Sequence, residues 1–188
     1  QGRHSFPTRR SSDLLTLQTT GNVTQTGALT TTGNVSLTST AGSVTLTNAG
    51  NSLGGSVAAS GTNVSLVDST ALQLGNVTAT GTLSATSTLG ITQASSTALS
   101  VGSTSTFTAD ASHDVVLDKT ANTFTGALSL GTVRDATVNA TGAVALGAAS
   151  SVGTLTLQTT GNVTQTGALT TTGNVSLTST AGDISLTQ

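Results

Sequence analysis

The 188-residue chain contains no cysteine, methionine, tryptophan or tyrosine, and its single proline is Pro7. The lack of cysteine excludes both a disulfide framework and a thiolate metal site. No segment approaches the run of about 20 apolar residues that a membrane-spanning helix needs, so we expect no membrane span. Glutamate is missing and lysine occurs once. Because both are strong helix formers, we expect almost no helix.

Charge is also scarce, because Asp, Glu, Lys and Arg together make up 6% of the chain. Three of the five basic residues lie within the first ten positions. Nucleic-acid-binding proteins neutralise several phosphates with clustered Lys and Arg, so we expect no nucleic-acid partner. His113 has no second histidine nearby with which to build a zinc site. The sequence has neither a phosphate-binding loop nor a calcium-binding nonapeptide, so we predict no cofactor and no metal.

What the chain does have is threonine and serine, which make up about a third of it, well above their share in ordinary domains. Thr and Val favour strands because branched side chains pack well on a pleated surface. Apolar and polar residues alternate, as in Val35 and Leu37 against Ser36 and Thr38. A period of two predicts half-buried strands with Val and Leu inside. We expect such strands at 22–26, 34–38, 43–47, 63–66 and 114–118.

The chain also repeats itself. Residues 15–42 return unchanged as 155–182, and a weaker copy of their first part occupies 83–93. A second block, 51–57, matches 122–128. Self-similarity at a fixed period is typical of solenoids, propellers and arrays. The chain is therefore built from units of about 70 residues.

Gly and Asn separate the expected strands at short intervals, where they suit bends with positive φ. Three strands per coil give coils of roughly 20–24 residues, about three per unit. This predicts an all-β fold, a parallel β-helix running continuously over 15–188. The alternatives are an array of antiparallel β-sandwich domains and a β-propeller. Sandwich domains usually have aromatic core anchors, and 15–188 has only Phe107 and Phe124.

Residues 1–14 differ from the rest, since they hold the only proline and three of the five basic residues. The run from His4 to Leu14 resembles the conceptual translation of a sequencing adapter, so we predict that it is an artefact. The alternatives are a basic arm and a truncated targeting peptide, although a secretory signal would need an apolar core. No Met begins the chain and Gln188 falls inside a repeat. We therefore expect a fragment of a longer protein.

Several segments resemble the β-strand repeats of filamentous haemagglutinin-type proteins, the large surface adhesins of Gram-negative bacteria. They are Gly-Asn-Val-Thr-Gln at 21–25 and 161–165, Leu-Gly-Ile-Thr-Gln at 89–93, the blocks 51–57 and 122–128, and Ala-Gly-Asp-Ile-Ser-Leu-Thr at 181–187. The resemblance implies a right-handed β-helical stalk, exported through an outer-membrane β-barrel to the cell surface. It also implies roles in attachment, aggregation or contact-dependent competition, with host or microbial surface glycans or proteins as partners.

The densest polar segment contains Asp110, Asp114 and Asp118, with His113 and Lys119 among them. On a strand over 114–118, two of these carboxylates would share the outer face. Paired carboxylates in β-helical enzymes perform acid–base work on polysaccharides or bind calcium. The alternative is a solvated edge and turn, which the scarcity of basic and aromatic groove residues favours.

We therefore expect a structural role, as the shaft of a secreted surface adhesin, and no enzymatic activity. The alternative function is a carbohydrate-active β-helix that uses Asp110, Asp114 and Asp118. Asn-Val-Thr and Asn-Val-Ser motifs formally match glycosylation acceptors, although turn chemistry already accounts for Asn at those positions. Uncapped solenoid ends also predict end-to-end self-association.

Overall fold

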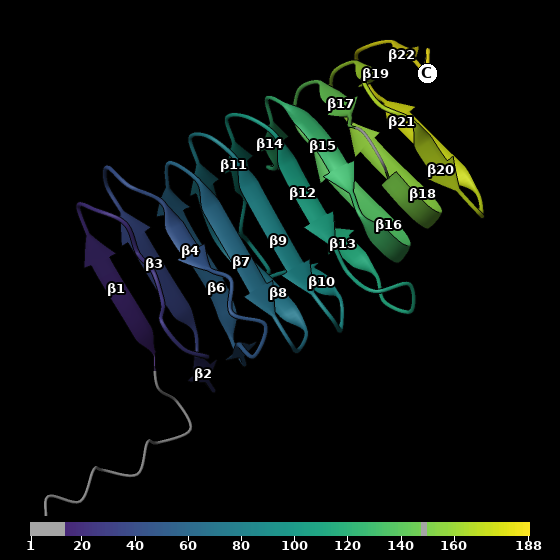
Figure 1. The fold of residues 1–188 in the computed structure, drawn as a ribbon. Helices are drawn as coiled ribbons and strands as arrows, with labels where there is room; N and C mark the ends of the chain where they lie inside the picture. Colours follow the sequence, from purple (N-terminus) through teal and green to yellow (C-terminus); the bar gives the residue numbers. More distant parts are fainter. Residues whose placement is uncertain (1–13, 148–149) are drawn as a thin grey trace, which may run out of the picture.

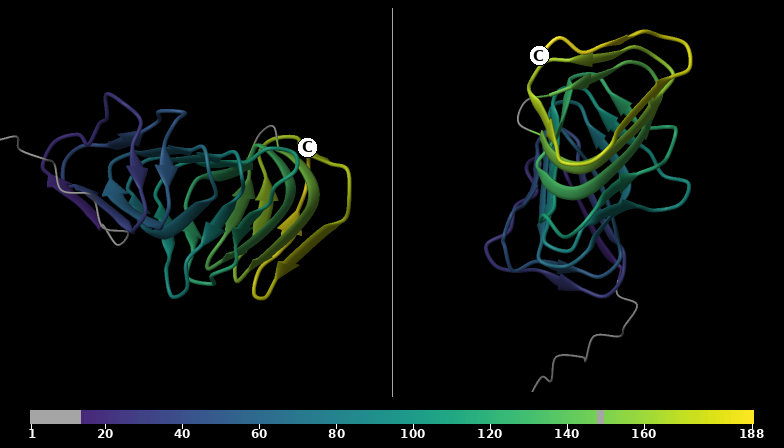
Figure 2. Two further views of the ribbon diagram at one scale, coloured as in Figure 1. Left: turned by 90° about the horizontal axis from the view of Figure 1, so that it is seen from below. Right: turned by 90° about the vertical axis from the view of Figure 1, so that its right-hand side faces the viewer.

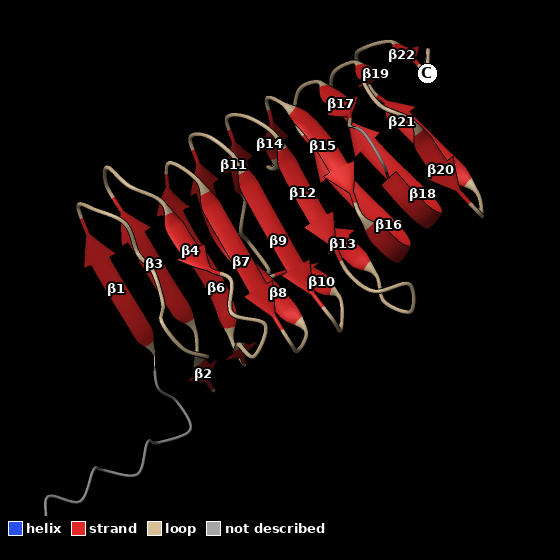
Figure 3. Cartoon of the chain, viewed as in Figure 1, coloured by secondary structure: helices blue, strands red, loops and turns tan. Residues whose placement is uncertain are grey.

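A computed structural model describes residues 14–147 and 150–188. Within these ranges every regular element is a β-strand, and all paired strands are parallel (Figures 1 and 3). The described residues contain no helix long and apolar enough to cross a membrane. The predicted artefact at 1–14 lies, apart from Leu14, outside the described residues. The prediction of an all-β parallel solenoid is confirmed.

The larger sheet, sheet A, has twelve strands, and its main path follows the order of the sequence. That path is β1 (Leu15–Thr19), β3 (Val35–Ser39), β6 (Ser56–Gly61), β8 (Leu72–Ala79), β10 (Ile91–Gln93), β13 (Val115–Leu117), β16 (Thr132–Ala140), β18 (Ser150–Thr159) and β20 (Leu169–Thr171). Beside it lie β11 (Leu99–Val101), β14 (Thr123–Phe124) and β21 (Val175–Ser179). Each strand therefore stacks on the strand one coil earlier, as Figure 2 shows.

The second sheet, sheet B, has eight strands and closes the other side of each coil. Its members are β4 (Val44–Leu46), β7 (Val64–Asp68), β9 (Leu83–Ser87), β12 (Ser105–Thr108), β15 (Ala127–Leu130), β17 (Val144–Leu146), β19 (Val163–Gln165) and β22 (Ile184–Ser185). A third, two-stranded sheet joins β2 (Thr30–Thr31) to β5 (Ser52–Leu53). The result is a parallel β-solenoid of about eight turns.

The strand registers measure the length of each coil. Leu15 pairs with Val35, and Ile91 pairs with Val115. Both steps lie within the predicted coil length of roughly 20–24 residues. The step from Val57 to its partner Leu74 is shorter, so the prediction is confirmed for the longer coils only. The turns between strands take up most of the difference, and the register of β6 on β8 shifts between Val57 and Ala59.

Val and Leu side chains from both sheets form one continuous core inside the coils. The predicted alternation is confirmed, because Val35 and Leu37 are buried while Ser36 and Thr38 are partly exposed. Full burial of one such side chain contributes about 1.5–3 kcal/mol. The two aromatic rings of this core, Phe107 and Phe124, meet edge to face with their centroids 6.2 Å apart.

One predicted strand is wrong. Of residues 22–26, Val23 alone pairs, as an isolated bridge to Val44. The identical sequence at 162–166 does contain a strand, β19, which pairs with β17 on one side and β22 on the other. In 22–26 the backbone bonds to the next coil involve Val23 alone, whose N–H donates to the Ser43 carbonyl and whose carbonyl accepts from the Thr45 N–H, whereas β19 lies between two ladder partners that satisfy more of its backbone.

Candidate functional site

The polar segment singled out in the sequence forms the turn after β12, the strand β13 and the turn that follows it. Asp110 lies at the start, and its Oδ1 is 2.7 Å from Nδ1 of His113. The same oxygen accepts a hydrogen bond from the backbone N–H of Ser112 at 2.8 Å. These bonds lower the pKa of Asp110, with the His113 hydrogen bond as the main cause. The Asp110 side chain therefore holds the turn between β12 and β13 through these two bonds.

Asp114 lies just before β13 and pairs with Arg134 on β16, one coil later. The guanidinium binds both carboxylate oxygens, Nε to Oδ1 at 2.8 Å and Nη2 to Oδ2 at 2.6 Å. This pairing lowers the pKa of Asp114 and raises that of Arg134. Sequence reasoning did not include Arg134 in the cluster. The sequence feature that could have identified Arg134 is its spacing from Asp114, which equals the length of one coil.

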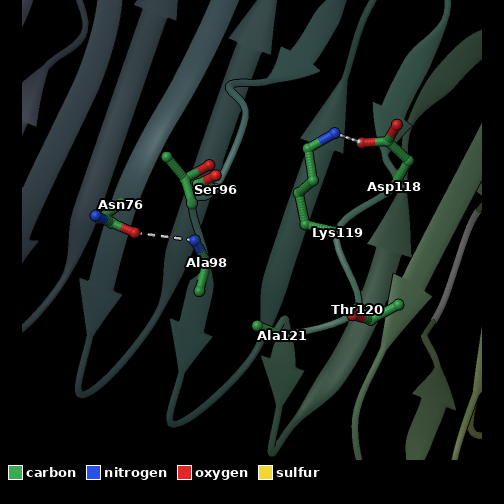
Figure 4. A pocket seen from close by; sticks show the side chains of 8 residues that line it. Asn76, Ser96, Ala98, Asp118, Lys119, Thr120 and Ala121 are labelled. Atoms are coloured by element: carbon green, nitrogen blue, oxygen red, sulfur yellow. Dashed lines mark hydrogen bonds and ion pairs between the residues drawn. The ribbon is translucent and has the colours of Figure 1, made fainter.

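Asp118 lies beyond the end of β13 and accepts a hydrogen bond from Nζ of Lys119 at 2.6 Å. Both line a shallow hollow of about 440 Å³ between the turns of neighbouring coils (Figure 4). On its other side, Oδ1 of Asn76 accepts a hydrogen bond from the backbone N–H of Ala98 at 2.9 Å. The complete lining is Asn76, Ser96, Thr97, Ala98, Asp118, Lys119, Thr120 and Ala121. Of the three predicted carboxylates, only Asp118 is part of it.

The structure therefore gives each predicted carboxylate a separate partner. A general acid needs a pKa raised towards the working pH, whereas the pKa values of Asp110 and Asp114 are lowered. Within 14–147 and 150–188, no three His, Cys, Asp or Glu side chains gather as metal ligands would. The arrangement is that of a surface hydrogen bond at Asp110 and surface ion pairs at Asp114 and Asp118, which solvent screens and which contribute little to stability.

The most elaborate polar arrangement lies instead inside the solenoid, and sequence reasoning missed it. The Asn51 side chain is fully buried and pairs with the Gln25 amide in both directions, at 2.7 and 2.9 Å. Its Oδ1 also accepts a hydrogen bond from the backbone N–H of Leu29 at 2.9 Å. Its Nδ2 donates to the carbonyl oxygens of Leu46 and Val67, at 3.3 and 3.0 Å. We call this arrangement an amide clasp, since it ties three coils together.

The same amide clasp recurs one repeat unit later. Asn122 is also fully buried and pairs with Gln93 at 2.8 and 2.9 Å. It accepts from the backbone N–H of Leu99 at 2.9 Å and donates to the carbonyls of Leu117 and Asn139. The sequence does contain a feature that points to the clasps, because the aligned blocks 51–57 and 122–128 each begin with the Asn that forms the clasp.

Three consecutive segments of the chain, residues 5–60, 61–131 and 133–188, match a family described as repeats of unknown function (DUF5649). The chain belongs to the DUF5649 family. Its middle repeat, 61–131, agrees with the unit of about 70 residues that the sequence blocks predict. No curated protein and no solved structure matches the chain.

The repeat boundaries agree with the clasps. Gln25 and Asn51 lie in the first DUF5649 repeat, and Gln93 and Asn122 lie in the second. In the third, Gln165 accepts a hydrogen bond from the backbone N–H of Gln188 at 3.5 Å, as Gln25 does from Asn48 in the first repeat. The amide clasp is therefore a structural feature that the first two DUF5649 repeats share.

A second set of Asn side chains joins neighbouring coils of the DUF5649 repeats at their surface. Oδ1 of Asn22 accepts a hydrogen bond from the backbone N–H of Ser43 at 2.8 Å, and Asn162 does the same with Asp183 at 2.9 Å. A Cβ added at Gly42 would overlap the Asn22 side chain. The Asn and Gly punctuation therefore shapes coil stacking. The expectation of positive φ at these positions is wrong for most of them, because among the described residues only Ser96, Gly90 and Gly142 have a positive φ. Equivalent bonds join Asn34, Asn63 and Asn76 to the backbone N–H groups of Ser56, Thr82 and Ala98.

Proposed function

We propose that residues 15–188 form part of the shaft of a secreted bacterial surface adhesin, which holds binding regions away from the cell. The observation that carries this proposal is the uninterrupted stack of coils, in which the strands pair in parallel from β1 to β21. A stack of about eight turns at a rise of about 4.8 Å is a rod of roughly 38 Å. Repeated units of this kind lengthen a rod without changing its cross-section.

The internal polar groups support this proposal. The amide clasps and the Asn side chains at the surface all bond to the next or previous coil, so they resist sliding and bending of the stack. Buried amide networks whose members are all hydrogen-bonded specify one packing of a core. A shaft needs a single packing that resists bending, because only a stiff spacer holds its tip at a fixed distance from its base.

The resemblance to filamentous haemagglutinin-type repeats supports a location at the bacterial cell surface. On this proposal the rod is exported through an outer-membrane translocation barrel and remains at the cell surface. Its partners are surface glycans or proteins of host or microbial cells, bound by regions that the rod displays. The hydroxyl-rich, weakly charged outer surface would add weak multivalent contacts.

The alternative, a carbohydrate-active β-helix, has less support. Asp110, Asp114 and Asp118 each bond to a different neighbour, and two of them have lowered pKa values. Replacing all three with Asn tests it directly. If the alternative holds, a polysaccharide-cleaving activity of the wild-type chain disappears in this variant while the circular dichroism spectrum stays unchanged.

The shaft proposal is tested by displaying the chain on a bacterial surface between a membrane anchor and a small binding domain. One, two or three copies of 15–188 are inserted, and the reach of adhesion to ligand-coated beads is measured. We expect the reach to grow by roughly 38 Å per copy, the rise of about eight coils. The control lacks the binding domain and should not adhere. Adhesion by that control, or a reach independent of copy number, would refute the spacer role.

A further inference from the structure

The hollow of about 440 Å³ shown in Figure 4 lies between two turns of neighbouring coils, one after β10 and one after β13. Both turns have counterparts in the first repeat, because the amide clasps fix the alignment. Gln93 and Asn122 form the second clasp as Gln25 and Asn51 form the first. The two turns depart from the first repeat in length and in charge, so the repeat alone does not account for the hollow.

The turn after β10 is longer than its counterpart. Residues 94–98 lie between the clasp Gln and the Leu whose backbone N–H bonds to the clasp Asn, whereas the first repeat has 26–28 there. Ser96 in this turn has a φ of +60°, the one positive φ of a non-glycine residue in the described part of the chain. That conformation is strained for a residue with a Cβ. The longer turn forms one wall of the hollow.

Three hydrogen bonds hold this wall in place. The Thr97 hydroxyl donates to the Ala94 carbonyl at 2.7 Å, and the Thr97 carbonyl accepts from Nε2 of Gln93 at 3.1 Å. Oδ1 of Asn76, on the previous coil, accepts from the backbone N–H of Ala98 at 2.9 Å. The wall is therefore tied both to the clasp and to the neighbouring coil, so it is formed before any ligand arrives.

The turn after β13 forms the other wall and adds charge. In place of Thr47 of the first repeat, it has Asp118. In place of Asn48 it has Lys119, the only lysine of the chain. The backbone N–H of the clasp Asn bonds to the carbonyl of this second residue in both repeats, so the turn forms without the ion pair. Nδ2 of Asn139, on the next coil, also donates to the Asp118 carbonyl at 2.9 Å.

The lining determines the class of ligand. Among the described residues that line the hollow, none is aromatic, so a nucleobase has no ring on which to stack. The one cation of the lining is already paired with Asp118 at 2.6 Å, so an anion gains little from it. The remaining side chains carry hydroxyl, amide or methyl groups: Ser96, Thr97, Thr120, Asn76, Ala98 and Ala121. Such a mixture matches the hydroxyl and C–H groups of a sugar, and the volume suits a small ligand.

We propose that this hollow binds an uncharged saccharide unit of a glycan without cleaving it. The Asp118 carboxylate accepts a hydrogen bond from one sugar hydroxyl, and the Lys119 ammonium donates to another. The longer turn flanks the sugar from the opposite wall. The site lies on the side of the solenoid, and it does not depend on the spacer role. A failed titration leaves the reach measurement unaffected, and the reverse also holds.

The test is a nuclear magnetic resonance titration of the full 188-residue chain with cellotetraose, maltotetraose, mannotetraose and chitotetraose. We expect at least one of these neutral probes to shift the backbone N–H signals of Ala98, Lys119 and Ala121 in a saturable way. Tetragalacturonate, an acidic probe, should bind more weakly. If none of the neutral probes shifts these signals, or if tetragalacturonate alone does so, the proposal is overturned.

The decisive variant, Asp118→Thr/Lys119→Asn, gives the turn the residues of the first repeat. Because it removes two charged hydrogen-bonding groups, the affinity for the bound probe should fall about tenfold or more. The matched control, Asp114→Asn/Arg134→Gln, removes another surface ion pair outside the hollow and should leave the affinity unchanged. Far-UV circular dichroism checks that both variants fold. Equal affinities of the two variants would also overturn the proposal.

Discussion

The amide clasp at Asn122 gives the sharpest prediction. Asn122→Leu replaces a fully buried amide with an apolar side chain of similar size, so little cavity forms. What it removes is five hydrogen bonds: two to Gln93 and one each to Leu99, Leu117 and Asn139. The Gln93 side chain is 6% exposed and cannot turn to water without disturbing the coil.

The magnitude follows from the groups left without partners. A buried donor or acceptor that loses its partner costs about 1–3 kcal/mol. The Gln93 amide and the Leu99 N–H lose most, while the two carbonyls keep other lone pairs. We therefore expect Asn122→Leu to lower the free energy of unfolding by about 3–5 kcal/mol, a large share of the roughly 5–15 kcal/mol typical of a domain.

The assay is urea unfolding followed by far-UV circular dichroism, since the chain has no tryptophan or tyrosine for fluorescence. Asn76→Ala is the matched control. It removes one exposed hydrogen bond to a neighbouring coil and should cost about 1 kcal/mol or less. The double variant Gln93→Leu/Asn122→Leu should cost less than the sum of the two single changes, because neither amide is then left unpaired. If Asn122→Leu costs no more than Asn76→Ala, this account of the clasp is refuted.

Three further predictions concern the core, the coil contacts and the surface charges. Ser105 is fully buried and its hydroxyl has no hydrogen-bond partner in the described structure, so Ser105→Ala should stabilise the protein by about 1 kcal/mol; a lower urea midpoint would contradict this. Gly102→Ala puts a Cβ onto a carbonyl oxygen of the previous coil, whereas Gly27→Ala meets nothing. The first should cost about 1–3 kcal/mol more than the second in the same assay, and equal costs would show that the coils separate easily. Arg134 lowers the pKa of Asp114 below 3.8, so the pair stabilises the fold above that pH and this stabilisation is lost as pH falls through the lowered pKa. Asp114→Asn should therefore flatten the acid limb of a thermal-melt series, and an unchanged limb would contradict the role of the pair.

The fold was largely predictable because its information is periodic. The alternation at Val35 and Leu37 predicted the inward and outward faces, and the duplicated 15–42 predicted a repeat architecture. A solenoid contacts mainly its nearest coils, so local pattern and period together specify most of its packing. Coil length was less predictable, because turns of different size can join strands that stay in register.

The polar sites were less predictable. Asp110, Asp114 and Asp118 stood out because charge is rare, but their partners decide their chemistry. Arg134 reaches Asp114 only because one coil brings them together. The buried Asn51 looked like turn punctuation in the sequence, since Asn is common in turns. Only the closed coil shows that its amide is inside.

The sequence alone determined the all-β character, the repeat period, the apolar interior and the lack of cysteine chemistry, because composition and alternation act locally along the chain. The tertiary structure decided which polar groups are buried, which carboxylates have cations, and whether an extended segment becomes a strand. Residues 22–26 and 162–166 demonstrate this, because they share one sequence and differ in structure. Backbone hydrogen bonds in a parallel sheet are made between coils, so each segment's state depends on what is stacked on either side of it.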